Sequence, residues 1–220
     1  MVRICFISDV HNKYKKLILP EADIIVCSGD ITSVGKEHEI RNFLKWYNGL
    51  NYQHKIFIAG NHDMMFENEG FFARSLVPYE IHYLQDSGVE LMGLYFYGTP
   101  VNKSFPRWAF HKDEDGLKKH WEAIPENTDI LITHNPPYGI LDKSIDQPQR
   151  FGSTSLYYEV FTRIKPVIHV YGHIHSGHGS KFISGTHFIN ASNLNEQYEV
   201  EYNPILVEIN ENKQIKILQE

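Results

Sequence analysis

One stretch near the start of the chain decides the fold: Val2-Arg3-Ile4-Cys5-Phe6-Ile7-Ser8-Asp9-Val10-His11. Residues Arg3–Ser8 are rich in Ile, Phe and Cys, which predicts a short buried β-strand. Asp9 and His11 follow that strand directly, and both side chains are of types that bind metal ions. The stretch therefore predicts a strand that ends in two candidate metal ligands.

The same pattern, a short apolar run followed by polar residues or glycine, recurs along the chain. The runs predicted as strands are Arg3–Ser8, Ile24–Ser28, Lys55–Ala59, Leu94–Tyr97, Ile130–Thr133 and Val167–Tyr171. Apolar residues at helical spacing predict helices over Glu37–Tyr47, Gly116–Ala123 and Ser153–Ile164, with Ser153 as an N-cap. The C-terminal third adds three strand-like segments with little helix between them, His187–Ala191, Ile205–Ile209 and Gln214–Leu218. Alternating strands and helices predict an α/β fold, and the C-terminal third predicts an antiparallel part of the sheet.

The residues that follow the strands carry the chemistry. Asp, Asn and His side chains stand at five strand ends, namely Asp9, His11, Asp30, Asn61, His134, His173 and His175. The carboxyl ends of parallel strands lie along one edge of an α/β sheet, so we expect these side chains to converge. Carboxylate, amide and imidazole ligands suit divalent ions such as Mn²⁺, Fe²⁺ or Zn²⁺. Because seven ligands are too many for one tetrahedral ion, the sequence predicts two divalent transition metal ions that share a bridging carboxylate.

The order of these motifs closely resembles that of the calcineurin-like metallophosphoesterases over nearly the whole chain. The matching motifs are Asp9-x-His11, Gly29-Asp30 with Gly35, Gly60-Asn61-His62-Asp63, His134 and Gly172-His173-x-His175. The resemblance implies a metallo-dependent phosphatase fold, a four-layer α/β/β/α sandwich with mixed sheets. It also implies the metal ligands: Asp9, His11, Asp30 and His175 for one ion, and Asp30, Asn61, His134 and His173 for the other.

A narrower resemblance is to the metallophosphoesterase-domain-containing subgroup. It rests on the run of residues 131–142, on Trp108-Ala109-Phe110 and on Asn190-Ala191-Ser192. Some members of that subgroup hydrolyse cyclic nucleotides and other phosphodiesters. The resemblance thus implies a metal-dependent phosphoric ester hydrolase whose substrate is a small phosphodiester, with nucleotides among the candidates. Purple acid phosphatases fit less well, since Ser33 stands where they have a tyrosine ligand.

The expected reaction is in-line attack on phosphorus by a hydroxide that bridges the two metal ions. His62 is adjacent to Asn61 but is not a ligand in the family pattern, so we predict that it is the general acid for the leaving alkoxide. We predict that Asp63 orients His62. A hydrogen bond that only stabilises the turn is the alternative interpretation of His62.

The irregular segment Thr99–Asp115 is the candidate for substrate selection. Its aromatic residues, Phe105, Trp108 and Phe110, are candidates for stacking on a nucleobase, and Arg107 for reaching a phosphate. Packing of Trp108 and Phe110 onto the core is the alternative. His178 likewise has two interpretations, contact with phosphate or with solvent.

Composition limits the class of protein. The 220 residues carry a net charge of −6, which argues against binding of extended nucleic acid. The apolar runs are shorter than the roughly 18 to 20 residues of a membrane span, and the N-terminus does not resemble a signal peptide. Cys5 and Cys27 are predicted to be buried thiols in neighbouring strands. We therefore expect one cytoplasmic domain over residues 1–220, with its oligomeric state left open.

Other functions remain open at this stage. A broad phosphomonoesterase or a nuclease would use the same metal site on a different substrate. An inert interaction scaffold belongs to another class, and it is disfavoured because all seven ligand positions and His62 are present. Metal analysis separates the classes, since a scaffold would purify without stoichiometric transition metal.

Overall fold

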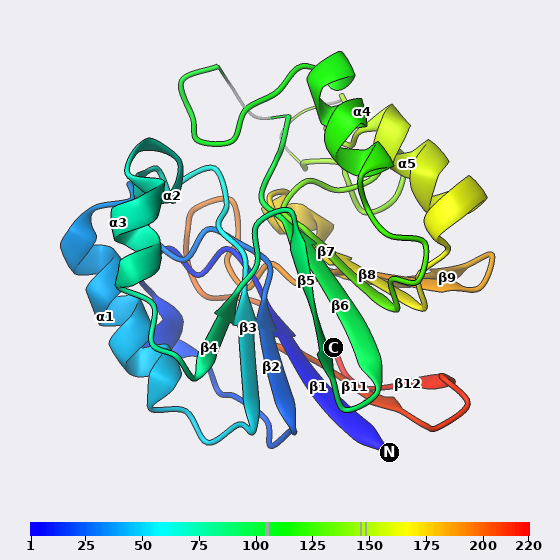
Figure 1. Ribbon diagram of the computed structural model, residues 1–220, viewed down its shortest axis with the longest axis horizontal. Helices are drawn as coiled ribbons and strands as arrows, with labels where there is room; N and C mark the ends of the chain where they lie inside the picture. Colours follow the sequence, from blue (N-terminus) through cyan, green and yellow to red (C-terminus); the bar gives the residue numbers. More distant parts are fainter. Residues whose placement is uncertain (104–105, 146, 148) are drawn as a thin grey trace.

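The computed structural model describes residues 1–103, 106–145, 147 and 149–220. Within these residues the strands form two sheets of six (Figure 1). The first sheet runs in the spatial order β12 (Ile215–Gln219), β11 (Ile205–Ile209), β1 (Val2–Ile7), β2 (Ile24–Cys27), β3 (His54–Phe57) and β4 (Ile81–Tyr83). The second runs in the order β5 (Ser87–Leu91), β6 (Leu94–Thr99), β7 (Ile130–Thr133), β8 (Ile168–Tyr171), β10 (Thr186–Asn190) and β9 (Gly179–Ile183).

Both sheets are mixed, with a parallel part and antiparallel edges. Strands β1 to β4 are parallel, and β11 and β12 extend that sheet in antiparallel pairing. Strands β6, β7, β8 and β10 are parallel, while β5 and β9 pair antiparallel at the two edges. The antiparallel pairing that was predicted for the C-terminal third is therefore found at β9, β11 and β12.

Alternation of side chains along the strands produces four layers. In β1, Cys5 and Ile7 pack among the helices on the outer face, whereas Ile4 and Phe6 pack against the second sheet. The outer face of the first sheet is covered by α1 (Glu37–Asn48), α2 (Met65–Asn68) and α3 (Gly70–Ser75) (Figure 1). The outer face of the second sheet is covered by α4 (Glu114–Glu122) and α5 (Thr154–Glu159). The order of layers is thus α/β/β/α, which confirms the predicted fold class.

The predicted strands and helices are present, with ends shifted by a few residues. Ser153 caps α5 as predicted, because its hydroxyl accepts a hydrogen bond from the Leu156 N–H at 3.1 Å. Helix α5 ends earlier than predicted and continues as the π-helical turn η2 (Val160–Ile164). The 3-10 turns are η1 (Tyr14–Lys16) and η3 (His175–Gly177).

The elements that the sequence pattern missed are short or lie at a sheet edge. They are β4, β5, β9, α2 and α3. Strand β5 reads Ser-Gly-Val-Glu-Leu, and β9 begins Gly-Ser-Lys, so neither has the run of buried β-branched residues that identifies a central strand. Edge strands with one exposed face are the elements that a hydrophobic pattern detects least well.

The arrangement brings the carboxyl ends of the parallel strands of both sheets together. Asp9 N donates to Gly29 O at 3.0 Å, which joins the loops after β1 and β2. Gly172 N donates to His134 O at 3.3 Å, which joins the loops after β8 and β7. A bridge between Ser8 and Ser192 links the first sheet to the second. The loops of five strands therefore meet at one edge of the sandwich.

Two smaller predictions concern the cysteines and the membrane. Cys5 and Cys27 are both buried and free, on the neighbouring strands β1 and β2, as expected. No helix in the described ranges is both long enough and apolar enough to cross a membrane.

Candidate metal centre

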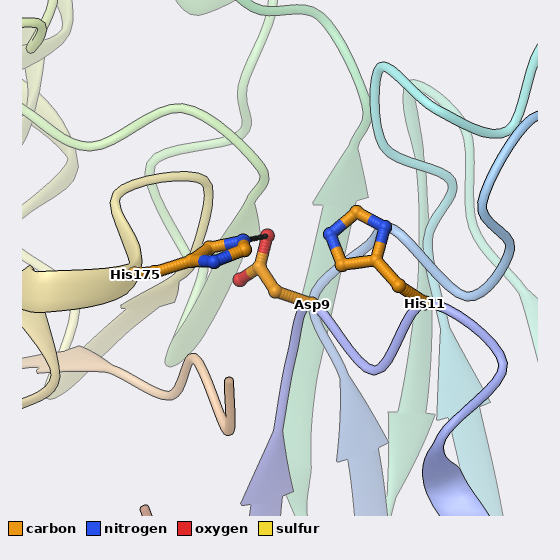
Figure 2. A group of neighbouring side chains, drawn as sticks. All are labelled: Asp9, His11 and His175. Atoms are coloured by element: carbon orange, nitrogen blue, oxygen red, sulfur yellow. Dashed lines mark ion pairs between the residues drawn. The ribbon is translucent and has the colours of Figure 1, made fainter. Parts of the chain in front are cut away.

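Side chains from separate strand ends form compact groups of candidate ligands. Within the described residues, three triplets have nitrogen or oxygen atoms that all lie within 4.8 Å of one another: Asp9, His11 and His175; His11, Asp30 and His62; and Asp9, Asp30 and His134. Figure 2 shows the first triplet, with the Asp9 carboxylate between the rings of His175 and His11. Five of the seven predicted ligands are thus brought together, and their roles as ligands stay a prediction.

Asp30 occupies the position between the two halves of this centre. Its Oδ2 atom lies 3.7 Å from His11 Nε2 and 3.4 Å from His134 Nε2. Its other oxygen, Oδ1, accepts a hydrogen bond from the His62 backbone N–H at 2.8 Å. One carboxylate oxygen therefore faces both halves, which is the arrangement that a bridging ligand requires.

Asn61 and His173 lie on the His134 side of Asp30. The Oδ1 atom of Asn61 is 3.0 Å from His134 Nε2, so the two groups face the same point. The His173 ring centroid is 5.1 Å from that of His134. His173 is outside the three compact triplets, although its backbone N–H donates to the Asp9 carboxylate at 3.0 Å.

Backbone carbonyl groups orient the histidine rings. The Nδ1 atoms of His11, His134 and His175 lie 3.1, 3.0 and 2.9 Å from the carbonyl oxygens of Thr32, Ser28 and Asn195 respectively. Since a carbonyl only accepts, each Nδ1 carries the proton and each Nε2 presents its lone pair to the centre when the ring is neutral. Metal-binding histidines are held in this way in known sites.

The backbone at the centre adopts a conformation that L-residues rarely use. Asp9, His11, Asp30 and His173 have φ angles of 51, 36, 52 and 69°, all in the left-handed region. Such residues each cost about 1–3 kcal/mol and cluster at functional sites, where the surrounding structure holds them in place. The strain here turns side chains from different loops towards one point.

Electrostatics link the buried carboxylates to the histidines. Burial by itself would lower the pKa of His134, but the charges of Asp30 and Asp9 raise that pKa to about 9. Burial would raise the pKa of Asp30, yet His134 and its other histidine neighbours hold it well below its usual value. The pKa of His11 falls to about 4, chiefly because of burial. Without a metal ion the centre therefore contains ionised carboxylates, a protonated His134 and a neutral His11.

The residues present fit divalent metal ions. His11 Nε2 is buried and has no hydrogen-bond partner, which is costly for a polar atom unless it binds something. That lone pair faces Asp30 Oδ2, and the neighbouring groups are carboxylates and imidazoles. Nitrogen and oxygen donors of this kind suit first-row transition ions.

The side chains of His62 and Asp63 have different hydrogen-bond partners. The His62 ring is oriented by Ser33, whose carbonyl oxygen lies 2.7 Å from Nδ1. The Asp63 carboxylate accepts hydrogen bonds from the backbone N–H groups of Ile31, Thr32 and Gly60 and from the Thr32 hydroxyl. The Asp63 side chain thereby joins the loops after β2 and β3, and its expected role in orienting His62 stays a prediction.

The centre opens into a cavity of about 340 Å³. Its lining includes residues at the centre, namely Asp30, Asn61, His62, His173 and His175, and loop residues such as Lys103, Trp108, Phe151, Glu196 and Tyr198. Tyr198 and Glu196 were not predicted from the sequence, because no strand or motif marks the turn that carries them.

The remaining predictions for the loops have mixed outcomes. Trp108 lies against His62 in a tilted contact with a centroid distance of 4.1 Å, whereas Phe110 is only 4% exposed and packs in the core. Phe105 lies outside the described residues. Arg107 is exposed and is not among the described residues that line the cavity. The His178 ring stacks on Tyr202, and its Nδ1 atom lies 2.8 Å from Ser192 O. The ring therefore packs against residues that follow β10.

Comparison with known proteins agrees with this geometry. The family described as calcineurin-like phosphoesterase matches residues 2–177, which include every candidate ligand. The chain belongs to the calcineurin-like phosphoesterases. Metallophosphoesterase domain-containing protein 1 from Homo sapiens and its Mus musculus counterpart are each 33% identical to it, over 94% of this chain and 71% of the relative.

Solved structures show the same fold at low sequence identity. A phosphopantetheinyl hydrolase from Mycobacterium tuberculosis aligns over 89% of this chain and 90% of its own, with a TM-score of 0.63 and 16% identity. Another crystal structure aligns over 99% of this chain and 98% of its own, with a TM-score of 0.67 and 17% identity. The family match identifies a metallophosphoesterase, and its buried Asp and His groups are consistent with a metal site typical of that family.

Proposed function

We propose that this phosphoesterase hydrolyses small phosphodiesters with two divalent ions, Mn, Fe or Zn, held by the seven strand-end ligands and with His62 as general acid. The observation that carries the proposal is the position of Asp30 Oδ2, which faces His11 Nε2 on one side and His134 Nε2 on the other. Asp9, His11 and His175 would hold the first ion, Asn61, His134 and His173 the second, and Asp30 both. When bound, the ions lower the pKa of a water molecule and neutralise the charge of the phosphoryl oxygens.

The size of the cavity favours a diester over a monoester. At about 340 Å³ it falls within the range of small-molecule sites, and it extends past the candidate ligands to Trp108 and Tyr198. A phosphate group with a second ester arm uses this space, whereas a minimal monoester leaves it empty. The Glu196 carboxylate in the wall also disfavours the extra negative charge of a monoester.

His62 is suited to supply the proton that the leaving group needs. Its Nδ1–H donates to Ser33 O at 2.7 Å, so the ring is fixed in the lining of the cavity and Nε2 is the nitrogen left to carry the transferable proton. The Trp108 ring lies against the His62 ring in a tilted contact with a centroid distance of 4.1 Å, and the His11 and His62 rings meet edge to face with a centroid distance of 4.6 Å. As water adds to phosphorus and the ester P–O bond breaks, a proton passes from Nε2 to the leaving alkoxide, and the ring regains a proton from water.

The test compares two leaving groups. His62→Ala should lower the hydrolysis of a diester with an alkyl leaving group, such as glycerophosphocholine, by about 10²–10⁴-fold, the usual contribution of a general acid. Hydrolysis of bis-p-nitrophenyl phosphate should fall much less, because p-nitrophenolate leaves without protonation. His38→Ala is the matched control, since His38 is exposed on α1. The metal content should remain at the wild-type value in both variants.

Two outcomes would overturn the proposal. Faster hydrolysis of p-nitrophenyl phosphate than of bis-p-nitrophenyl phosphate by the wild type would favour a phosphomonoesterase. Equal losses for both leaving groups in His62→Ala would remove the role of general acid.

The buried free thiols Cys5 and Cys27 support a reducing compartment, so the cytoplasm remains our proposal for the location of the protein.

A further inference from the structure

Helix α1 carries a buried carboxylate that the proposed reaction does not use. Glu39, in the first turn of α1, is only 8% exposed, whereas Glu37 in the same turn is exposed. Charged side chains are rarely buried unless they have partners. Glu39 is not among the described residues that line the cavity, so any effect on the reaction must pass through other residues. Its hydrogen-bond partners therefore decide what it does.

One oxygen of the Glu39 carboxylate caps the helix. Oε2 accepts hydrogen bonds from the backbone N–H groups of Lys36 at 2.9 Å and Val34 at 3.4 Å. A glutamate that returns in this way to the N–H before the first turn is one half of a capping box. Burial would raise the pKa of Glu39, but hydrogen bonds from Lys36, Asn12 and Val34 hold that pKa below its usual value. The side chain is therefore ionised at neutral pH.

The other oxygen, Oε1, binds the loop after β1. The side-chain amide of Asn12 donates to Glu39 Oε1 at 2.6 Å and to the Ser33 hydroxyl at 2.9 Å. Asn12 has a φ angle of 66°, in the left-handed region that asparagine adopts more readily than most residues. A helix cap needs neither of these two bonds. Through one asparagine, Glu39 thus connects α1 to Ser33 in the loop after β2.

Ser33 is the residue that orients His62. Its carbonyl oxygen lies 2.7 Å from His62 Nδ1, and its hydroxyl donates to His11 O at 3.4 Å. Asn12 therefore holds the side chain of the same residue whose backbone fixes the His62 ring. A general acid must lie within hydrogen-bond reach of the group that it protonates, so the position of Ser33 affects how well His62 can act.

We propose that Glu39 and Asn12 form a positioning pair that holds Ser33 and thereby fixes the His62 ring for proton transfer to the leaving group. Neither member of the pair is among the described residues that line the cavity or form the three compact triplets. The inference rests on the proposed function, because it takes His62 as the general acid. It makes the reaction depend on a carboxylate that lies outside the cavity.

The test exchanges the two polar groups in the metal-loaded full chain. Asn12→Asp places a second carboxylate against Glu39, so charge repulsion should break their contact. Combining Asn12→Asp with Glu39→Gln restores a carboxylate–amide pair with the groups exchanged, and glutamine is accepted in a capping box. Ser33→Ala removes the hydroxyl that Asn12 holds and adds no charge, so it repeats the test independently.

Glu37→Gln is the matched control for these variants. Glu37 belongs to the same helical turn as Glu39, but it forms a surface ion pair with Arg41. Exposed pairs of this kind contribute little to stability, so the control should have wild-type activity on every substrate. It separates the loss of a charge at this end of α1 from the loss of the contact with Asn12.

The expected signature is a loss that depends on the leaving group. Asn12→Asp and Ser33→Ala should each lower kcat for glycerophosphocholine by about tenfold and that for bis-p-nitrophenyl phosphate much less. The exchange variant should recover most of the loss. In the His62→Ala background, Asn12→Asp should cause no further loss with glycerophosphocholine, because residues that act through one another are not additive. A purely structural role would lower both rates and add to the effect of His62→Ala.

A crystal structure of the Asn12→Asp protein separates this inference from the proposed function. The distance between His62 Nδ1 and Ser33 O should increase beyond roughly 3.5 Å, the limit of a hydrogen bond, and the exchange variant should restore it. A displaced His62 ring in a protein whose His62→Ala variant shows no dependence on the leaving group would leave the positioning pair standing and refute the general acid.

Three outcomes would overturn the positioning pair. The first is a wild-type rate with glycerophosphocholine in folded Asn12→Asp and Ser33→Ala proteins, even if His62→Ala behaves as proposed. The second is an exchange variant that recovers none of the loss. The third is weaker Mn²⁺ binding with equal losses on both substrates, because the pair would then act through His11 and not through His62.

Discussion

The substitution Gly60→Ala disturbs the proposed bridging carboxylate without removing any candidate ligand. A Cβ atom at Gly60 would lie 2.2 Å from Asp30 Oδ1, 2.4 Å from Asp30 N and 2.8 Å from Asp30 Cγ. Contacts below 3.0 Å are essentially never observed for real Cβ atoms, so Asp30 must move. The carboxylate then shifts by about 1 Å, and such overpacking costs about 1–3 kcal/mol of stability. The backbone nitrogen is crowded as well, so rotation of the side chain alone does not relieve the contact.

The shift should weaken both halves of the metal centre. Displacing a group that positions metal ligands typically costs about 10–100-fold in metal affinity. A misplacement of about 1 Å at a reacting centre can cost about 100-fold in rate. Calorimetric titration with Mn²⁺ and the hydrolysis rate of bis-p-nitrophenyl phosphate measure the two effects, while circular dichroism and thermal unfolding show whether the variant is folded.

Gly70→Ala is the matched control for this experiment. Gly70 begins α3, and a Cβ atom there would meet nothing within 4 Å. Alanine favours a helix over glycine by about 1 kcal/mol, so the control should be as stable as the wild type or more so, with unchanged Mn²⁺ affinity. A folded Gly60→Ala protein with wild-type Mn²⁺ affinity and rate would refute the reasoning, since the position of Asp30 would then not matter.

Three further perturbations test other parts of the centre. Asp63→Ala leaves three buried backbone N–H groups without their acceptor, so it should lower the free energy of unfolding by about 3 kcal/mol or more in a denaturant titration, and an unchanged midpoint would exclude the structural role of Asp63. Ser192→Ala removes the hydroxyl that donates to Asp9 Oδ2 at 2.6 Å, so Mn²⁺ should bind about 10-fold more weakly by calorimetry in a variant that melts like the wild type. Because the pKa of His134 is raised to about 9 in the metal-free fold from 6.5, its protonation stabilises that fold below pH 6.5, and this contribution is lost as the pH rises through 9. A metal ion must displace that proton, so Mn²⁺ affinity should rise by about tenfold per pH unit towards pH 9 and then level off; a flat profile between pH 6.5 and 9 would contradict this.

The sequence predicted the parts of the centre that local patterns determine. The buried runs before Asp9 and His134 have the composition of central strands, and in an α/β sandwich the residues just after such strands share one edge. That is why Asp9, His11, Asp30, His134 and His175 were expected together, and the structure brings them together.

The features that the sequence did not reveal depend on side-chain direction and on long-range packing. Asp63 is next to His62 in sequence, but successive residues of the turn point to different partners, and the Asp63 carboxylate faces the backbone after β2. Tyr198 is far from His11 in the sequence. The two rings are in contact because the turn that begins at Asn195 packs against His175. Neither the hydrogen bonds of Asp63 nor the ring contact of Tyr198 corresponds to a periodic pattern or a motif in the sequence.

The most direct test of the account is the anomalous diffraction of crystals of this protein soaked with Mn²⁺. The account predicts two manganese peaks on either side of Asp30, one within ligand distance of Asp9, His11 and His175 and the other within ligand distance of Asn61, His134 and His173. A single peak, or two peaks that do not share the Asp30 carboxylate, would contradict the shared two-metal centre on which the proposed function rests.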